Sequence, residues 1–510
     1  MNDFTGFGIL TLLTVLPLAG AIIALFIPRH ARGVALISAL ISLVLALVVW
    51  LHLPADGSIG LVERISWVPS LGIEYHLGVD GLGALMVLLS AVVTLMSIDA
   101  AHRVHHLPGL YYALVLALEA GLFGSFTALN FFHWFLFWEL SLIPAFFLIK
   151  LWGGPKRGPA ATQFFVYTMA GSVALLISFL AVYLSTATHT QPGSMDFIEL
   201  AALASNGTLT AHLGAAMPWL AMGVLAGFAV KVPLFPFHTW LPAAYAEAPS
   251  PVTMLLTGAM SKMGVYGLLR IAIPLFGPQI AALRTPLLIL AVATVVMGAW
   301  AAAAQKDLKR VFAYSSVNHL GYCLLGIFAL AVPAGGTAVQ ASQAAAFNGV
   351  ILQMFNHGLT AAALFWFMAM IQFRTGGLRG IDDFGGLRKP APVFAGLMGI
   401  ALFSSLGLPG LNGFVGEFLI FRGVFPLSWM SATASVLGLL VTAAVILTVI
   451  QKVFSGPVPE HWAKFPDLHQ SERLALAPVI GLMILLGLVP QLIVDGVNPT
   501  VQYLLAHWRF

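Results

Sequence analysis

Apolar stretches long enough to cross a lipid bilayer follow one another along nearly the whole sequence. A membrane-spanning helix needs about 20 mostly apolar residues, and about fourteen runs of this kind lie between polar breaks. Their ranges are 8–27, 34–53, 79–99, 110–129, 131–150, 161–185, 215–236, 251–274, 284–304, 311–332, 343–372, 392–421, 430–454 and 475–496. The runs at 343–372 and 392–421 exceed one span, so we expect a break or a tilt in each. The sequence predicts an all-α, polytopic membrane protein with about fourteen transmembrane helices.

The composition agrees with this fold class and excludes a soluble one. Hydrophobic residues make up 60% of the chain and charged residues only 8%, whereas soluble chains carry about 25% charged residues. A β-barrel is excluded because its strands alternate polar and apolar positions. The basic residues behind the net charge of +4 are scattered, so the lipid bilayer is an expected partner and nucleic acid is not.

Cofactor-binding motifs are missing from the sequence. Cys323 is the single cysteine, which excludes an intrachain disulfide, a thiolate-ligated iron–sulfur cluster and a covalent c-type haem. Neither a GxGxxG fingerprint nor a Walker A motif occurs, so we expect no dinucleotide or ATP binding. His102, His105 and His106 resemble metal ligands, but they share a short loop without acidic companions, and we expect no metal there. The energy source is then an ion gradient or a partner protein.

The positive residues assign an orientation to the chain. Most of the 23 Lys and Arg residues fall in alternate short loops, around 28–32, 155–157 and 305–310 and in the region 374–389. Because cytoplasmic loops are rich in positive residues, we expect these loops inside and both termini on the outer face. The first apolar run is too long and lacks the basic front of a signal peptide, so it is expected to stay as a helix.

Two apolar runs are interrupted in a similar way. Residues 230–236 read VKVPLFP and residues 407–413 read GLPGLNG, so each run contains helix breakers close to an ionisable side chain. Hydrocarbon cannot satisfy the backbone groups that such a break frees, whereas a water-lined path can. Paired interrupted helices are typical of secondary transporters with inverted repeats, in which the ion path passes the breaks.

Seven ionisable side chains lie well inside the predicted spans. A charge at the bilayer centre costs at least ~2.5–3.5 kcal/mol, so each needs a partner, a proton or a function. They are Glu119, Glu139, Lys231, Lys262, His319, His357 and Glu417. Their distribution predicts a proton path with these residues as transfer sites. The structural alternative is an inert membrane scaffold that retains buried charges.

Glu139, Lys231 and Lys262 give the sharper signals. If Glu139 contacts Lys231, the carboxylate holds the amine charged while burial favours the neutral amine, so weakening the pair releases a proton. The alternative is a static ion pair that locks two helices together. Lys262 has no acidic residue within one turn, and its ammonium is too far from either end of the span to reach water. We therefore interpret Lys262 as a protonatable relay.

His319, Glu417 and Glu119 are weaker signals when taken singly. A lone histidine is most often a satisfied core residue, and Ser315, one turn earlier, could fix the tautomer of His319. When His319 is considered together with Lys262 and Glu417, a relay role for His319 is favoured. Glu417 follows the second break, in the position expected for proton release. Glu119 precedes small residues that permit close helix contact, so it is either a link to a neighbour or a hydrogen bond between helices.

Arg270 and Arg284 lie near the predicted outer rim of the bilayer. Arginines at this depth commonly anchor a span to the headgroup layer. We therefore interpret both as anchors.

Several stretches resemble one known family. Residues 137–144 (FWELSLIP), 230–244, 261–266 (SKMGVY) and 313–321 (AYSSVNHLG) are similar to the proton-channel subunits of respiratory complex I. That superfamily also contains Mrp-type sodium/proton antiporters and membrane-bound hydrogenases. The resemblance implies fourteen helices with two inverted five-helix repeats that contain the broken helices.

The resemblance also implies a division of the chain. A three-helix N-terminal segment is expected at 1–109 and a C-terminal transmembrane helix at 475–510. Between them, the first antiporter-like repeat at 110–274 forms the uptake half-channel and the second at 284–454 forms the release half-channel.

The same resemblance gives the buried residues their roles. Glu139 and Lys231 are the uptake pair, and Lys262 is the central relay. His319 and His357 connect this relay to Glu417, which is the exit residue. The M type of the family is the most similar, because it has glutamate at the exit position, where the L and N types carry lysine.

The implied function is that of a proton-translocating subunit in the membrane arm of a bacterial NADH:quinone oxidoreductase, in the inner membrane beside other antiporter-like subunits. NADH, FMN, iron–sulfur clusters and quinone are then expected in partner subunits, with no redox centre in this chain. The alternative within the superfamily is the D subunit of an Mrp-type cation/proton antiporter.

Overall fold

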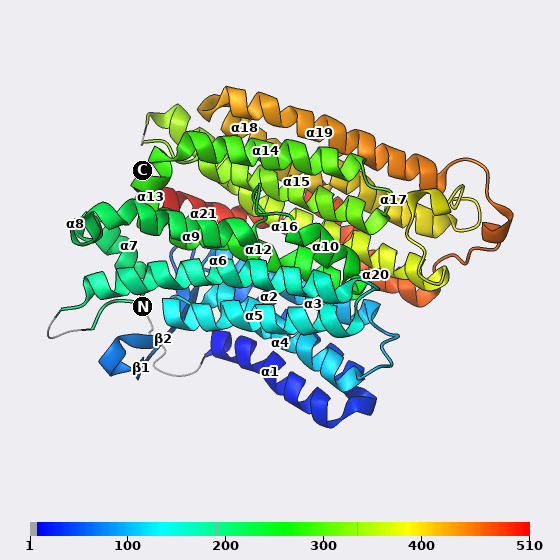
Figure 1. The fold of residues 1–510 in the computed structure, drawn as a ribbon, viewed down its shortest axis with the longest axis horizontal. Coiled ribbons are helices and arrows are strands. Elements are labelled where there is room, and N and C mark those ends of the chain that lie inside the picture. The colour runs from blue at the N-terminus through cyan, green and yellow to red at the C-terminus, as the bar shows by residue number, and fades with distance from the viewer. Residues whose placement is uncertain (1–7, 189–191, 334) are drawn as a thin grey trace.

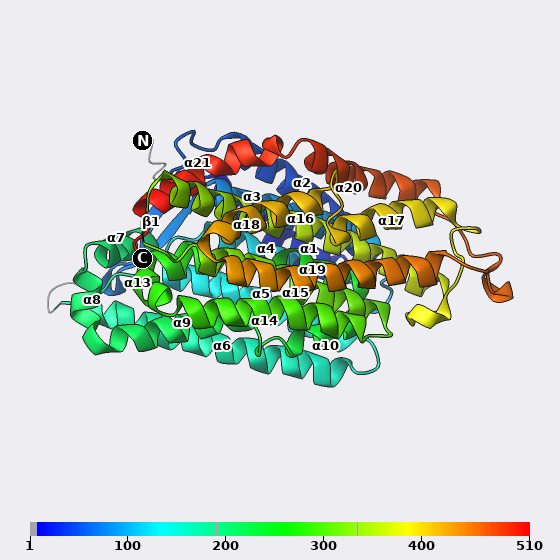
Figure 2. The same ribbon diagram turned by 90° about the horizontal axis from the view of Figure 1, so that it is seen from above.

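The helices lie side by side in one elongated bundle, and most run along its long axis (Figure 1). The computed structural model describes residues 8–188, 192–333 and 335–510. Residues 1–7 of the expected N-terminal segment therefore lie outside the described part. Seen after a 90° turn, most of the helices again follow the same axis (Figure 2). A shared axis is the arrangement expected of packed membrane-spanning helices.

Most predicted spans form one continuous helix. These are α1 (Ile9–Phe26), α2 (Ala31–Leu51), α3 (Gly81–Ala100), α4 (Pro108–Thr127), α5 (Phe131–Trp152), α6 (Arg157–Thr186), α14 (Arg284–Ala303), α15 (Leu308–Ala329), α16 (Thr337–Arg374), α19 (Trp429–Val449) and α20 (Gln470–Leu488). Among the described residues, 13 helices are long and apolar enough to cross a membrane. The predicted helical, multi-span fold is confirmed.

Both predicted breaks are present. The run at 215–236 ends as α9 (Met217–Lys231), and a new helix, α10 (Trp240–Glu247), begins beyond the break. The run at 392–421 is divided into α17 (Pro392–Leu406) and α18 (Asn412–Leu427). Each break thus separates two half-helices, as the proline and glycine residues indicate.

A third span is irregular in a way that the sequence does not signal. It consists of α11 (Ser250–Leu255), α12 (Lys262–Gly267) and α13 (Ile273–Ala282), joined by the π-helical turns η4 (Leu256–Met260) and η5 (Leu268–Ala272). Single π-helical turns are frequent at functional sites. This span carries Lys262, one of the predicted proton sites.

Small residues face the bundle interior, and large aliphatic residues face the lipid. On α2, Ala35, Ala39 and Ala46 are fully buried, whereas Ile37 and Leu40 are exposed. Small side chains let helix backbones approach closely, and lipid solvates aliphatic side chains as well as a protein core does. The arrangement explains how polar residues can remain in the centre while the outside stays apolar.

One end of the bundle is covered by a hairpin and three short helices. Strand β1 (Gly60–Val68) pairs antiparallel with β2 (Ile73–Val79). The helices at this end, at the left of Figure 1, are α7 (Phe197–Ser205), α8 (Thr208–Leu213) and α21 (Gln491–His507).

Two polar contacts tie the hairpin end to the spans. The Glu63 carboxylate accepts hydrogen bonds from Leu10 N at 2.7 Å and Thr11 Oγ1 at 2.5 Å, where a carboxylate complements the dipole at the start of α1. Gly81 N at the start of α3 donates to Thr500 Oγ1 of α21 at 2.9 Å. The start of α1 and the helix α21 therefore share one end of the bundle. Which membrane face this end meets stays a prediction.

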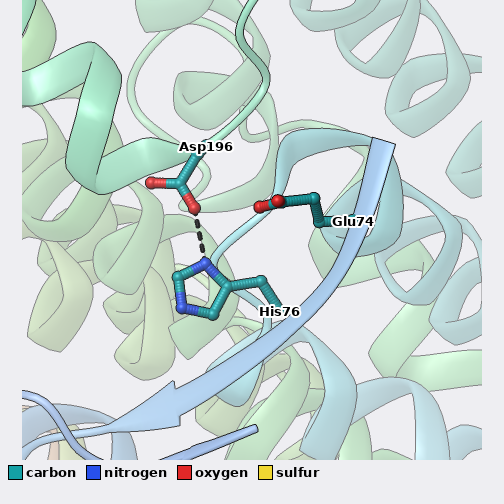
Figure 3. A group of neighbouring side chains, drawn as sticks. All are labelled: Glu74, His76 and Asp196. Carbon is teal, nitrogen blue, oxygen red and sulfur yellow. Dashed lines mark hydrogen bonds and ion pairs between the residues drawn. The ribbon is translucent and has the colours of Figure 1, made fainter. Parts of the chain in front are cut away.

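A buried polar junction fixes β2 to α7 (Figure 3). His76 Nδ1 lies 2.5 Å from Asp196 Oδ2, while Asp196 Oδ1 caps α7 by accepting from Ile198 N and Glu199 N. Burial by itself raises the pKa of Asp196, but the hydrogen bonds from His76 and the α7 backbone outweigh it and lower that pKa. Glu74 faces the pair and is bound by Arg64 at 2.8 Å. Potential metal-ligating atoms of Glu74, His76 and Asp196 lie within 4.8 Å of one another, yet each residue already has a protein partner.

Candidate proton-transfer site

The first break places Lys231 inside the bundle. Lys231 is the last residue of α9 and is 3% exposed. Backbone groups freed by the break have partners: Trp240 Nε1 donates to Val230 O at 2.9 Å, and Phe235 N donates to Thr294 Oγ1 at 2.9 Å. These bonds remove the cost of an interrupted helix in hydrocarbon, so the break is a stable feature that holds the lysine in place.

Lys231 rests on an aromatic ring rather than on a carboxylate. Its Nζ lies 4.8 Å from the centroid of the Trp138 ring, and Trp138 Nε1 is fixed by a 2.9 Å bond to Ser172 Oγ. No ion pair joins Lys231 to Glu139 among the described residues, so the direct contact considered from the sequence is not formed there. Glu139 remains within electrostatic range of Lys231, and its Oε1 is buried without a hydrogen-bond partner in the described part.

Lys262 sits where the π-helical turn η4 ends. Ser261 N donates to Leu256 O at 3.1 Å, one residue further back than in an α-helix. The carbonyl of Thr257 accepts instead from Lys262 Nζ at 2.5 Å and from Ser261 Oγ at 3.0 Å. The irregular turn thereby supplies an oxygen for a fully buried ammonium group, which the sequence reading missed.

Lys262 contacts His357 directly. Lys262 Nζ lies 2.8 Å from His357 Nδ1, a contact across 95 residues of sequence. Two glycines bring the helices together: a Cβ added at Gly358 would lie 2.5 Å from Gly258 O, so α16 and η4 touch through their backbones. The missing side chains are what allow the lysine and the histidine to meet.

His319 and Glu417 form the second buried contact. His319 Nδ1 lies 2.8 Å from Glu417 Oε1, and His319 Nε2 lies 3.3 Å from Ser405 Oγ. The bond that Ser315 could make to His319 is not formed, because the Ser315 hydroxyl has no partner among the described residues. Glu417 reaches the imidazole because α18, which begins after the break at 407–411, packs against α15.

The two contacts are joined by neighbouring imidazole rings. The ring centroids of His319 and His357 are 5.2 Å apart, and both rings line one internal cavity with Ser316 and Thr360. The cavity offers about 10 Å³, close to the ~10–15 Å³ that one water needs. A continuous polar series therefore runs from Lys262 through His357 and His319 to Glu417.

Gln353 is a polar member of this series that the sequence reading did not single out. Its Nε2 donates to Glu417 Oε1 at 3.2 Å and lies 3.4 Å from His319 Nδ1. A neutral amide carries no insertion cost comparable to a charge, so it gives no hydropathy signal. Its place on α16, one helical turn before His357, is the only pattern that could have indicated it.

Among the described residues, no hydrogen bond joins Lys231 to Lys262, and the void beside Lys231 is too small for a water molecule. Lys231 and Ser261 line the same small internal void together with Tyr245. A Cβ added at Gly264 would lie 3.1 Å from the Cβ of Lys231, so α12 packs tightly on the end of α9. The two lysines thus lie on neighbouring helices, α9 and α12, beside the first break.

Glu119 stands apart from the series. It is fully buried on α4, and neither carboxyl oxygen has a hydrogen-bond partner among the described residues. The predicted close contact of the small residue beside it is confirmed, since a Cβ at Gly121 would lie 2.8 Å from Ser141 N of α5. The structural alternative, a hydrogen bond between helices, is absent from the described part. Burying an ionised carboxylate without a partner is costly, so this carboxyl is expected to carry its proton.

Arg270 is not the rim anchor that the sequence suggested. Its side chain is buried and forms an ion pair with Asp80, the residue that caps α3. Arg284, by contrast, donates to Leu427 O at 2.8 Å and joins α14 to the end of α18. Lys309 is also almost fully buried and donates to Ala248 O at 2.5 Å. These contacts hold the ends of neighbouring spans together, and they lie outside the polar series from Lys262 to Glu417.

The arrangement can pass a proton by short steps. Distances of 2.8 Å lie within the range for proton transfer between heteroatoms. A neutral imidazole can accept a proton on one ring nitrogen and release the other proton from the second nitrogen. The amine, the two imidazoles and the carboxylate therefore offer alternating acceptors and donors through otherwise apolar spans.

The comparisons with known proteins identify related membrane subunits. The family described as "NADH:quinone oxidoreductase/Mrp antiporter, TM" matches residues 128–446. NADH-quinone oxidoreductase subunit M of Rhodobacter capsulatus is 34% identical to the chain, over 98% of this chain and 97% of that protein.

Two solved structures extend the similarity to the fold. A chain of respiratory complex I from Thermus thermophilus has a TM-score of 0.86 at 29% identity, covering 98% of this chain and 99% of that one. A chain of the Mrp complex from Dietzia sp. has a TM-score of 0.82 at 21% identity, with 98% of both chains covered, and shows the shared fold alone. The family match covers more than half of this chain, and the Rhodobacter relative covers nearly all of it. The chain belongs to the NADH:quinone oxidoreductase/Mrp antiporter family of membrane subunits.

Proposed function

We propose that this chain is the M-type membrane subunit of a bacterial NADH:quinone oxidoreductase and that it carries protons from Glu139 and Lys231 to Glu417. The observation that supports this function is the series of polar contacts from Lys262 to Glu417 inside hydrophobic spans. A scaffold has no need of four adjoining titratable groups in hydrocarbon, where each is costly.

The uptake step begins at the first break. Glu139 acts on Lys231 through space, and the Trp138 ring supports the charged amine without binding it as tightly as a carboxylate does. A weakly held ammonium group gives up its proton more readily. The proton then passes from Lys231 toward Lys262, whose chain neighbour Ser261 lines the same small void as Lys231.

The release step ends at the second break. Protons move from Lys262 through His357 and His319, and Gln353 keeps Glu417 oriented toward His319. Glu417 lies beside the interruption, since a Cβ added at Gly407 would come within 2.9 Å of Glu417 Oε2. A broken helix is where water can reach a carboxylate in a membrane.

The driving reaction belongs to partner subunits in this proposal. NADH, FMN, iron–sulfur clusters and quinone are assigned to other chains, and neighbouring antiporter-like subunits flank this one in the inner membrane. The identity of 34% with a subunit M over almost the full length supports this assignment. Glu119, a fully buried carboxyl without a partner in the described part, is proposed as a further proton-transfer site within this chain. Both termini are proposed to face outward.

The Mrp-type D subunit is the second candidate. The Dietzia Mrp chain has nearly the same fold, but at 21% identity this likeness carries no function. One experiment separates the candidates: affinity purification of the tagged chain from its native membrane, followed by identification of partners and assay of NADH:quinone reduction. Redox subunits and quinone reduction with proton uptake support the proposal. Small membrane partners with sodium/proton exchange and no redox activity contradict it.

A further inference from the structure

A large cavity lies at the end of the bundle opposite the hairpin, outside the proton series. Its volume is about 840 Å³, within the ~300–1,000 Å³ usual for ligand sites. Its walls come from the end of α3, the start of α4, the end of α16 and the start of α20. This end carries most of the basic loops, so the cavity is expected at the cytoplasmic headgroup layer.

The cavity has an excess of positive charge. Its two carboxylates are already neutralised, because Asp99 pairs with Arg32 at 2.9 Å and Glu472 pairs with Arg374 at 2.6 Å. Arg103 also lines the cavity and has no ion-pair partner in the part of the chain that the structure describes. Its guanidinium stacks on the ring of Phe373 at 2.8 Å from the ring centroid. One cationic group is thus left facing the cavity.

Histidines add hydrogen-bond donors around this charge. His102, His105 and His106, which the sequence suggested as metal ligands, line the cavity together with His469. They do not gather around a point, since the single Glu/His/Asp/Cys group close enough to hold an ion in the described residues lies at the other end of the bundle. His102 Nε2 accepts from Arg103 Nε at 3.2 Å, so His105, His106 and His469 are the imidazoles left to donate N–H groups to the oxygens of a phosphate.

A buried donor without a partner also lines this cavity. Tyr111 is fully buried, and its hydroxyl has no hydrogen-bond partner among the described residues. Leaving a buried hydroxyl unpaired costs roughly 1–3 kcal/mol, and such a group in a native fold points to a missing ligand or water. The ring itself is fixed, because it packs edge-on against Trp152 at 5.2 Å.

The remaining wall of the cavity is apolar, and one of its aromatic rings is exposed. Trp152, Trp366 and Met370 line the cavity. Phe373 lines it as well and is 47% exposed, as a side chain at the bilayer surface is. An apolar wall with an exposed aromatic ring suits acyl chains, whereas a free inorganic anion gains nothing from contact with it.

We propose that this cavity binds the phosphate headgroup of an anionic membrane phospholipid, with Arg103 as its main contact and the Tyr111 hydroxyl at its inner wall. Basic pockets between spans at the cytoplasmic face are a general mode of anionic lipid binding. The bound lipid joins α3 and α4 to α16 and α20. Because α16 carries Gln353 and His357, the lipid also steadies the helix at the centre of the proton series. The site is independent of the proposed function.

The test uses the intact complex in lipid nanodiscs with a photoreactive phosphatidylglycerol. Crosslinks to residues 99–111 and 366–373 are mapped by peptide mass spectrometry. Arg103→Gln is expected to lower the crosslink yield about tenfold, because a hydrogen bond to a charged group is lost. Tyr111→Phe keeps the ring packing and is expected to lower the yield severalfold. Arg29→Gln removes an exposed arginine from the same end and serves as the control with unchanged yield.

Two further experiments distinguish a lipid headgroup from a free phosphate ion as the group that binds in the cavity. A phosphatidylcholine probe is expected to crosslink poorly, because its headgroup carries no net charge. An excess of inorganic phosphate is expected to leave the phosphatidylglycerol yield unchanged. Loss of crosslinking in phosphate would show a free-anion site and overturn the lipid assignment. Wild-type yields in both Arg103→Gln and Tyr111→Phe would overturn the site itself.

Discussion

His319 Nδ1 lies 2.8 Å from Glu417 Oε1, so a histidine in the middle of a continuous span meets a carboxylate beside a broken one. The two residues are 98 positions apart in sequence. Their contact connects the chain of imidazoles to the point where a span is interrupted. A proton that reaches His319 therefore has an acceptor next to the break.

Gln353 is expected to support this contact from α16. Gln353→Leu removes the amide that bonds Glu417 at 3.2 Å, while the His319 contact can persist. A hydrogen bond to a charged group is worth about 1.5–3 kcal/mol, so proton pumping should slow roughly tenfold with assembly intact. Pumping by the purified complex in proteoliposomes measures this. Gln340→Leu, an exposed position on the same helix, is the control.

Because no direct ion pair joins Glu139 to Lys231 in the described residues, we expect the two residues to be coupled only weakly. Breaking a buried contact pair costs ~3–5 kcal/mol, whereas residues that interact only through space couple by about 1 kcal/mol or less. The thermal stabilities of complexes with Glu139→Gln, Lys231→Met and both changes form a double-mutant cycle. We expect nearly additive effects. A coupling of several kcal/mol would mean that the residues are in contact in the membrane.

The glycine contact between α16 and η4 is expected to be sensitive to a single methyl group. In Gly358→Ala, the new Cβ meets Gly258 O at 2.5 Å, so the helices must separate and Lys262 loses His357. Overpacking of this kind costs about 1–3 kcal/mol. Both thermal stability and pumping should fall. Gly396→Ala, where the added carbon meets nothing within 4 Å, should change neither.

The sequence predicted the buried charges and both breaks for physical reasons. Lys262 and Glu417 are conspicuous because charges are rare and costly in apolar runs. The proline and glycine residues at 230–236 and 407–413 mark the breaks through their effect on the backbone. These signals are local, so they can be read without knowing which helices touch.

Contacts between distant segments could not be predicted in this way. The meeting of Lys262 with His357 depends on Gly258 and Gly358, whose closeness appears only when the helices pack. Arg270 was read as an anchor because hydropathy cannot show that Asp80 lies opposite it. The sequence therefore predicts which charged residues are buried better than it predicts which residues contact each other.

The junction of His76 with Asp196 is expected to hold the hairpin to α7. Asp196→Asn weakens the bond to His76 and the cap of α7, at a cost of about 1–2 kcal/mol. Native contacts lower the pKa of Asp196 from its ordinary value of 3.8. The ionised carboxylate therefore makes its full contribution to the free energy of unfolding above that pH, and this contribution is lost as the pH falls below it. Hydrogen exchange at neutral pH should be faster in β2 and at the start of α7. Glu199→Gln, which keeps both bonds, should leave exchange there unchanged.

Proton transfer through Lys262 is the central claim, and Lys262→Met tests it most directly. Methionine fills similar space without a proton, so the complex should assemble. The measurement is the number of protons moved per NADH oxidised by the purified complex in proteoliposomes, with Lys150→Met, an exposed lysine at the end of α5, as the control. We predict that proton movement through this subunit is lost in Lys262→Met and unchanged in the control. An unchanged proton count in assembled Lys262→Met complex would contradict the account.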